Sequence, residues 1–263
     1  MTTLTEKVEE TIDKALQRAE SNWKESGSAF DELMSEGLEH AEVIIKGNAV
    51  SRNKSLTDFF PVDFNSSEER DLVCISADLR DSTNRIKTHF NDLGSYKNKF
   101  QRAYYITSAL LPSLEVVINH YDGFVSEFLG DGVLGFFDAK KQKSDAIRNS
   151  GMASKYIVQS LSPMLEKRLQ EYYKEEIMHI GVGLAMSPTL LSKVGLGSGA
   201  EIKAFGPCVY DASKLNFGRN EVFVESSLQA EWPKAIDGNG GLSFKRMSSS
   251  KVDLDYYRMI PNS

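Results

Sequence analysis

The N-terminal part of the chain has a helical pattern of hydrophobic positions. Apolar side chains recur every four residues at Leu4, Val8, Ile12 and Leu16. A second apolar stripe follows between Phe30 and Ile45. This spacing predicts two amphipathic helices, and thus a helical extension over residues 1–50. We expect the helices to pack on the main domain, with a dimerising or partner-binding arm as the alternative. The segment 51–70 loses the period and contains Pro61, which predicts a connecting loop.

From residue 71 onward, short strand patterns alternate with longer helical ones. Strands are expected at Leu72–Ala77, Phe124–Leu129, Val133–Phe137 and His179–Met186. Helices are expected at Tyr96–His120, interrupted or bent near Pro112, and at Ser144–Tyr173. The glycines of the last strand indicate a close approach by another backbone or a ligand. The order βαββαβ predicts an α+β fold of the ferredoxin-like type, an antiparallel sheet with helices on one face, and a further strand and helix follow.

Composition and charge narrow the class of protein. The chain has 263 residues, 41% hydrophobic and 26% charged, so it can bury a substantial core. A net charge of -6 argues against binding to nucleic acid, which requires clustered basic residues. Two cysteines are too few for a disulfide framework, and no segment resembles a membrane span or a signal peptide. We therefore expect a soluble, cytoplasmic protein with no nucleic-acid or membrane partner.

Two aspartates stand out where strands end or turn. Asp78 follows the strand Leu72–Ala77, and Asp131 lies in the hairpin turn Gly130-Asp131-Gly132. The predicted order places both on adjacent central strands. Magnesium prefers one or two carboxylates and completes its shell with water and phosphate oxygens. One ion of a pair can activate a hydroxyl while the other neutralises the leaving oxygens. An aspartate in an Asp-Gly turn is often only turn chemistry, but the two motifs together predict a phosphoryl-transfer site.

Three motifs in order resemble the class III nucleotide cyclases. They are Ala77-Asp78-Leu79-Arg80-Asp81-Ser82-Thr83, the Gly130-Asp131-Gly132 turn, and the segment from Phe205 to Lys214. The resemblance runs from about Leu72 to the end, which implies a nucleotide cyclase catalytic domain over residues 71–263. It implies two Mg²⁺ or Mn²⁺ ions held by Asp78, Leu79 and Asp131.

The same resemblance implies how substrate and subunits are arranged. The segment that wraps the triphosphate of the nucleoside triphosphate substrate would be Leu79, Arg80, Asp81, Ser82 and Thr83. In this family, the metal aspartates come from one chain and the base-reading and transition-state residues from its partner, which implies a homodimer with active sites at the interface. The alternative for Arg80 and Asp81 is a simple surface pair with each other.

The residues that would read the base depart from those of adenylate cyclases. Glu127 stands where those enzymes place a lysine, and Lys203 stands where they place an aspartate. A carboxylate accepts hydrogen bonds from N–H groups, and an ammonium donates them to carbonyls. The pair therefore suits a base with a ring N–H beside a carbonyl, such as uracil or guanine, and does not suit adenine. Guanylate cyclases also carry glutamate at the first position, so Glu127 alone does not separate the two.

Further departures fall on the transition-state residues. Tyr210 replaces the family's asparagine, Lys214 replaces its arginine, and Asp81 replaces a glycine. Tyrosine still donates a hydrogen bond and lysine still carries a charge, although as a point rather than a fork; for Lys214, a solvated helix residue is the alternative.

With the single domain behind a short helical extension, these departures resemble the bacterial pyrimidine cyclases of the Pycsar antiphage defence system. That resemblance implies conversion of UTP to 3′,5′-cyclic UMP and pyrophosphate, and a product that acts on a separate cyclic-nucleotide-gated effector. The alternatives, in order, are a cytidylate cyclase, a guanylate cyclase and a non-catalytic nucleotide-binding module.

Overall fold

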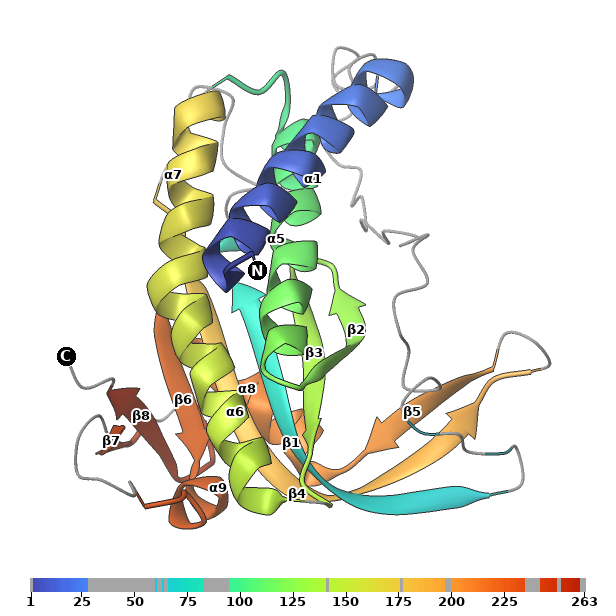
Figure 1. Cartoon of the computed structure of the whole chain (residues 1–263), viewed down its shortest axis with the longest axis vertical. Coiled ribbons are helices and arrows are strands. Elements are labelled where there is room, and N and C mark those ends of the chain that lie inside the picture. The colour runs from blue at the N-terminus through green and yellow to red at the C-terminus, as the bar shows by residue number, and fades with distance from the viewer. Residues whose placement is uncertain are drawn as a thin grey trace.

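The computed structural model describes residues 2–27, 60, 63, 66–82, 95–140, 142–175, 177–196, 200–234, 242–249 and 252–260. Over these residues, the strands form one eight-stranded sheet in the order β2-β3-β1-β4-β6-β8-β7, with β5 paired to β4 beside that path (Figure 1). The strands are β1 Ser67–Leu79, β2 Phe124–Leu129, β3 Gly132–Asp138, β4 Ile180–Val194, β5 Glu201–Phe205, β6 Glu221–Glu225, β7 Ser243–Met247 and β8 Tyr256–Ile260. All neighbouring strands are antiparallel except β4 and β6, which are parallel.

The helices cover this sheet and complete the predicted α+β fold. They are α1 Leu4–Ser26, α5 Lys99–His120, α6 Lys143–Tyr156, α7 Ser162–Tyr173, α8 Pro207–Leu215 and α9 Ser226–Ala230. The π-helical segment Ile157–Leu161 joins α6 to α7, so the long helix expected over Ser144–Tyr173 is present with one wide turn in it. Pro112 lies inside α5, so the helix is not interrupted there, and the alternative of a bend stays a prediction.

Two strands are longer than the sequence pattern indicated. β1 begins at Ser67, inside the segment expected to be a loop, and pairs with β4 from that residue onward. β4 continues past Met186 to Val194, where it pairs with β5. These extensions form an arm that projects beyond the body of the sheet (Figure 1). The stripe Phe30–Ile45, expected as a second N-terminal helix, lies outside the described residues.

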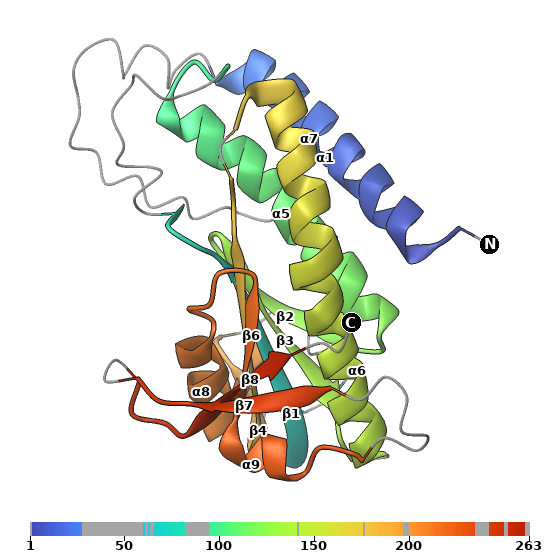
Figure 2. The same cartoon turned by 90° about the vertical axis from the view of Figure 1, so that its left-hand side faces the viewer.

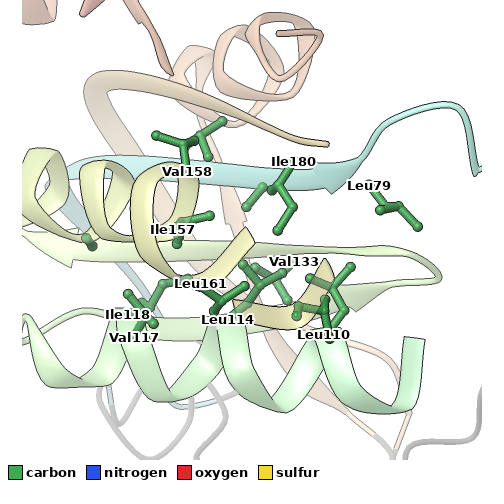
Figure 3. Packing of buried hydrophobic residues seen from close by; sticks show 14 of the residues in the cluster. Leu79, Leu110, Leu114, Val117, Ile118, Val133, Ile157, Val158, Leu161 and Ile180 are labelled. Carbon is green, nitrogen blue, oxygen red and sulfur yellow. The ribbon is translucent and has the colours of Figure 1, made fainter. Parts of the chain in front are cut away.

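The larger hydrophobic core lies between the sheet and the helices α5, α6 and α7. Inward-facing residues of β1, β3 and β4 meet the apolar faces of these helices. Figure 3 shows the centre of this layer, to which α5, the π-helical turn and the strands contribute Leu114, Leu161, Val133 and Ile180. This layer holds the ends of β1 and β3 in fixed positions.

Helix α8 covers the opposite face of the sheet, which corrects the expectation of helices on one face only (Figure 2). Cys208 and Ala212 of α8 pack against Leu72 and Cys74 of β1. The backbone of α8 comes so close to β4 that a Cβ at Gly183 would overlap the carbonyl oxygen of Ala212. The predicted close approach at the β4 glycines is therefore confirmed, and the approaching group is a helix backbone.

The first N-terminal helix packs on the main domain, as expected. Thr3 and Glu6 form a capping box at its start. Its apolar stripe is buried mainly against α5 and consists of Val8, Ile12, Ala15, Leu16, Ala19 and Trp23. Nowhere in the part of the chain that the structure describes is a helix both long enough and apolar enough to cross a membrane.

Candidate active site

The two aspartates singled out in the sequence lie together at one end of the central strands. Asp78 is the penultimate residue of β1 and is paired in register with Gly132 of β3. Asp131 occupies the turn between β2 and β3, and its carbonyl oxygen accepts a hydrogen bond from the Leu79 amide at 3.2 Å. A Cβ on Gly132 would lie 2.5 Å from the Ala77 carbonyl oxygen and 3.0 Å from Asp78 Oδ1. Glycine at position 132 therefore permits the close approach of the two strands.

The electrostatics of Asp78 reflect this proximity. Burial, followed by the charge of Asp131, raises the pKa of the Asp78 carboxyl to about 7, although Arg80 acts in the opposite direction. Arg80 Nη1 lies 3.5 Å from Asp78 Oδ2. Two carboxylates that disfavour each other's charge are suited to a shared divalent cation. Among the described residues no group of three or more His, Cys, Asp or Glu side chains is placed to hold a metal, so further ligands would come from backbone, water and substrate.

The segment expected to wrap a triphosphate turns sharply after β1. The Arg80 amide donates to the His179 carbonyl oxygen at 2.8 Å, and Arg80 Nη1 donates to the Asn216 carbonyl oxygen at 3.3 Å. Asp81 has a φ of 60°, a left-handed conformation that aspartate tolerates better than most residues. Its carboxylate pairs with Arg219 at 2.6 Å, so Arg80 and Asp81 pair with other residues rather than with each other. Ser82 follows directly, and Thr83 lies outside the described residues.

The two residues expected to read the base contact each other. Lys203 Nζ of β5 lies 3.3 Å from Glu127 Oε1 of β2 and 3.2 Å from Glu201 Oε2. Burial lowers the pKa of Lys203, but the nearby carboxylates of Glu127 and Glu201 outweigh it and raise the pKa overall. The fold thus joins a donor and an acceptor from strands that are far apart in sequence, in a half-buried position.

Tyr210 and Lys214 lie one turn apart on α8 and also contact each other. The Lys214 ammonium sits 4.2 Å from the centre of the Tyr210 ring, a cation–π arrangement. The residue Tyr210 is 60% exposed. Lys214 therefore has an aromatic partner on its own helix, and its role toward a phosphate stays a prediction.

Three residues near these groups were not found from the sequence. Arg219 pairs with Asp81, Asn216 accepts from Arg80, and Glu201 pairs with Lys203. The first two contacts join segments more than a hundred positions apart, so no local spacing signals them. Glu201 lies two positions before Lys203 on one strand, and this same-face spacing was a signal that could have been used.

Comparisons with known proteins bear on this arrangement. No protein-family model matches the sequence, and no curated protein matches it. Solved structures do match. The structure of the guanylyl cyclase Cya2 has a TM-score of 0.60 at 14% identity, covering 73% of this chain and 93% of that one. The adenylyl cyclase CyaB from P. aeruginosa has a TM-score of 0.61 at 13% identity, covering 75% and 97%.

The fold is that of the class III nucleotide cyclase domains. At these identities, the likeness establishes the fold and leaves the chemistry to the residues of the site. A class III adenylyl cyclase-like ATP-binding protein from Pseudomonas aeruginosa is also similar, with a TM-score of 0.52 at 20% identity, covering 65% of this chain and 36% of that one. The fold therefore occurs both in proteins described as cyclases and in one described as a binding protein.

Proposed function

We propose that this protein is a nucleotide cyclase that converts UTP to 3′,5′-cyclic UMP and pyrophosphate. The observation that carries the proposal is the pair of carboxylates Asp78 and Asp131, held together at the strand ends of a class III cyclase fold. The charges of Glu127 and Lys203 suit uracil or guanine and not adenine, and the resemblance to the pyrimidine cyclases favours uracil. We propose UTP as the substrate, with CTP as the first alternative and GTP as the second.

The reaction is attack of the ribose 3′-hydroxyl on the α-phosphorus, with pyrophosphate leaving in line. Asp78, Asp131 and the Leu79 backbone would hold two Mg²⁺ or Mn²⁺ ions, which when bound supply activation of the hydroxyl and neutralisation of charge. Arg80, next to Asp78, balances the negative charge of the site. Tyr210 would donate a hydrogen bond and Lys214 a positive charge to the reacting phosphate.

Recognition of the base follows from hydrogen-bonding polarity. Glu127 would accept from the N3–H of uracil, and Lys203 would donate to a neighbouring carbonyl. Cytosine lacks that N–H but offers its exocyclic amine to the same glutamate. Adenine presents no ring N–H beside a carbonyl. In the free protein, Lys203 pairs with both Glu127 and Glu201, so a base would compete with these contacts.

A homodimer would complete each active site. In the resembled family the metal residues and the base-reading residues of one site belong to different chains. Large apolar side chains are exposed on the arm, in the part where β4 pairs with β5. They are Leu190, Val194 and Phe205. Exposed apolar groups of this kind are typical of contact surfaces between proteins. The arm is therefore our choice for part of the dimer interface.

The biological setting is proposed from the resemblance to the Pycsar cyclases. The enzyme would act in the cytoplasm during phage infection, and cyclic UMP would switch on a separate cyclic-nucleotide-gated effector. The three departures from ordinary cyclases at Asp81, Tyr210 and Lys214 support this assignment.

Replacing Glu127 tests the assignment of the base. Glu127→Gln provides an amide that both donates and accepts, so we expect the preference for UTP over CTP to narrow by about tenfold. The measurement is kcat/KM for UTP, CTP and GTP. Glu201→Gln is the matched control, because Glu201 also pairs with Lys203 and should leave the preference unchanged. An unchanged preference in Glu127→Gln would remove this residue from base recognition.

A second candidate function is a nucleotide-binding module without turnover. The residues Tyr210 and Lys214 favour this second function, since class III cyclases use an asparagine and an arginine at these positions in the transition state. The neighbouring carboxylates argue against it, because their mutual repulsion has little use without a metal-dependent reaction. Tight binding of UTP without any cyclic product would select this alternative.

A further inference from the structure

The loop between α8 and β6 is hydrogen-bonded to the end of β1, which carries Asp78, and to the start of β4. At one end of the loop, Asn216 Nδ2 donates to Ser76 Oγ at 3.0 Å, and the Asn216 carbonyl oxygen accepts from Arg80. At the other end, Asn220 Oδ1 accepts from the Ile180 amide at 2.9 Å, and the Asn220 amide donates to the Ile180 carbonyl oxygen at 3.0 Å. The loop is therefore held at both ends beside the turn after β1.

Arg219 projects from this loop toward the same turn. Its Nη2 lies 2.6 Å from Oδ2 of Asp81, three positions after Asp78. The Arg219 side chain is 61% exposed, and ion pairs between exposed groups contribute little to stability. The small gain in folding stability from this ion pair therefore does not explain why a long side chain is held in this place. Its position beside the segment expected to wrap phosphates offers a better explanation.

We infer that Arg219 is a phosphate-binding residue for the terminal phosphates of a nucleoside triphosphate, a role that rests on the proposed function. In the free protein, Asp81 holds the guanidinium in place. A triphosphate that enters the turn brings several oxygens to the same guanidinium, and the planar fork of arginine suits phosphate especially well. Arg219 then transfers from one carboxylate to the phosphate. Arg219 thus provides, from the same chain as Asp78, a planar guanidinium that binds phosphate through two N–H groups, which the Lys214 ammonium cannot do.

Two variants with opposite expected effects test this role. Arg219→Gln removes the fork and should weaken binding of inorganic tripolyphosphate in the presence of Mn²⁺ by about tenfold or more. Asp81→Asn frees Arg219 and removes a negative charge, while asparagine keeps the tolerance for positive φ. This variant should bind tripolyphosphate more tightly than the wild type. Isothermal titration calorimetry on the purified full chain gives both affinities.

Arg246→Gln is the matched control. Arg246 is also an exposed arginine paired with an aspartate, at 3.1 Å from Asp255, but it lies on β7. Its replacement should leave tripolyphosphate affinity unchanged. If Arg219→Gln binds like the wild type, or if Arg219→Gln and Asp81→Asn weaken binding equally, Arg219 is only a partner of Asp81 and the inference is wrong. No binding of tripolyphosphate by the wild type would also overturn it.

The cyclase assay separates this inference from the proposed function. A wild type that binds tripolyphosphate through Arg219 but cyclises none of the four nucleoside triphosphates would disprove the proposed function and keep the phosphate site. A wild type that cyclises UTP, with KM and kcat unchanged in Arg219→Gln, would keep the function and disprove the phosphate site. We expect a raised KM in Arg219→Gln, with a smaller change in kcat.

Discussion

Asp78 is the residue whose environment most clearly reflects the proposed chemistry. Its carboxyl is partly buried and faces Asp131, and both effects raise its pKa to about 7. The sequence motif was sufficient to find both aspartates, because each follows or interrupts a strand-forming run. Arg219 could not be found in this way, since its partner Asp81 adopts a left-handed conformation in a distant turn. Such a contact depends on the tertiary fold rather than on local spacing.

The raised pKa of Asp78 predicts how pH and metal act on stability. The unfolded carboxyl titrates near its ordinary value of about 3.9. Without metal, the stabilising contribution of protonated Asp78 is therefore fully present below that pH and is lost as pH rises through about 7. Mn²⁺ binds the ionised form, so it should raise Tm more at pH 8 than at pH 5. Thermal melts of wild type and Asp78→Asn at both pH values check this. An equal Mn²⁺ effect in the variant would place the metal elsewhere.

At the scale of elements, the main wrong prediction from the sequence was that all helices lie on one face of the sheet, because α8 covers the other face. The apolar spacing of Cys208, Ala212 and Leu215 predicts a buried stripe, but a stripe does not indicate which face of the sheet it covers. A usable signal was present in β1, where Leu72 to Ile75 form an unbroken buried run. Such a run is typical of a strand covered on both faces. Strand ends in the arm were missed because they carry polar residues.

The contact between β4 and α8 predicts the effect of filling a glycine. A Cβ at Gly183 would overlap the Ala212 carbonyl oxygen, so Gly183→Ala must displace α8. We expect the free energy of unfolding to fall by about 1–3 kcal/mol or more, as in other overpacked sites. Cyclase turnover should also fall, because α8 carries Tyr210 and Lys214.

Gly130→Ala is the comparison for this substitution in denaturant unfolding. Gly130 has a φ of 61°, but the position of its absent Cβ has no neighbour within 4 Å. Only the strained backbone should cost stability there, about 1–2 kcal/mol. Turnover that remained normal in Gly183→Ala would show that α8 does not position reacting groups.

At the scale of the whole molecule, we propose that two chains share each active site. The acidic pair lies at the ends of β1 and β3, whereas Tyr210 and Lys214 lie on the exposed side of α8. Exposed apolar residues on the arm offer a surface for the second copy. We therefore expect one chain's aspartates to act with the partner's α8.

Mixing two inactive variants tests the shared site. Asp78→Ala and Lys214→Ala together should form heterodimers with one intact site of two, giving about a quarter of wild-type turnover after random exchange. Asp78→Ala mixed with Asp131→Ala is the control, because no pairing restores both aspartates to one chain. Recovery in the control, or none in the first mixture after confirmed exchange, would contradict a site built from two chains.

The most direct test of the central claim is to identify the product. The purified chain is incubated with Mn²⁺ and, separately, UTP, CTP, GTP and ATP, and the products are analysed by mass spectrometry. We predict cyclic UMP and pyrophosphate as the main products, with turnover lost in folded Asp78→Ala and Asp131→Ala. A preference for GTP would contradict the pyrimidine assignment, and the absence of any cyclic nucleotide would contradict the cyclase itself.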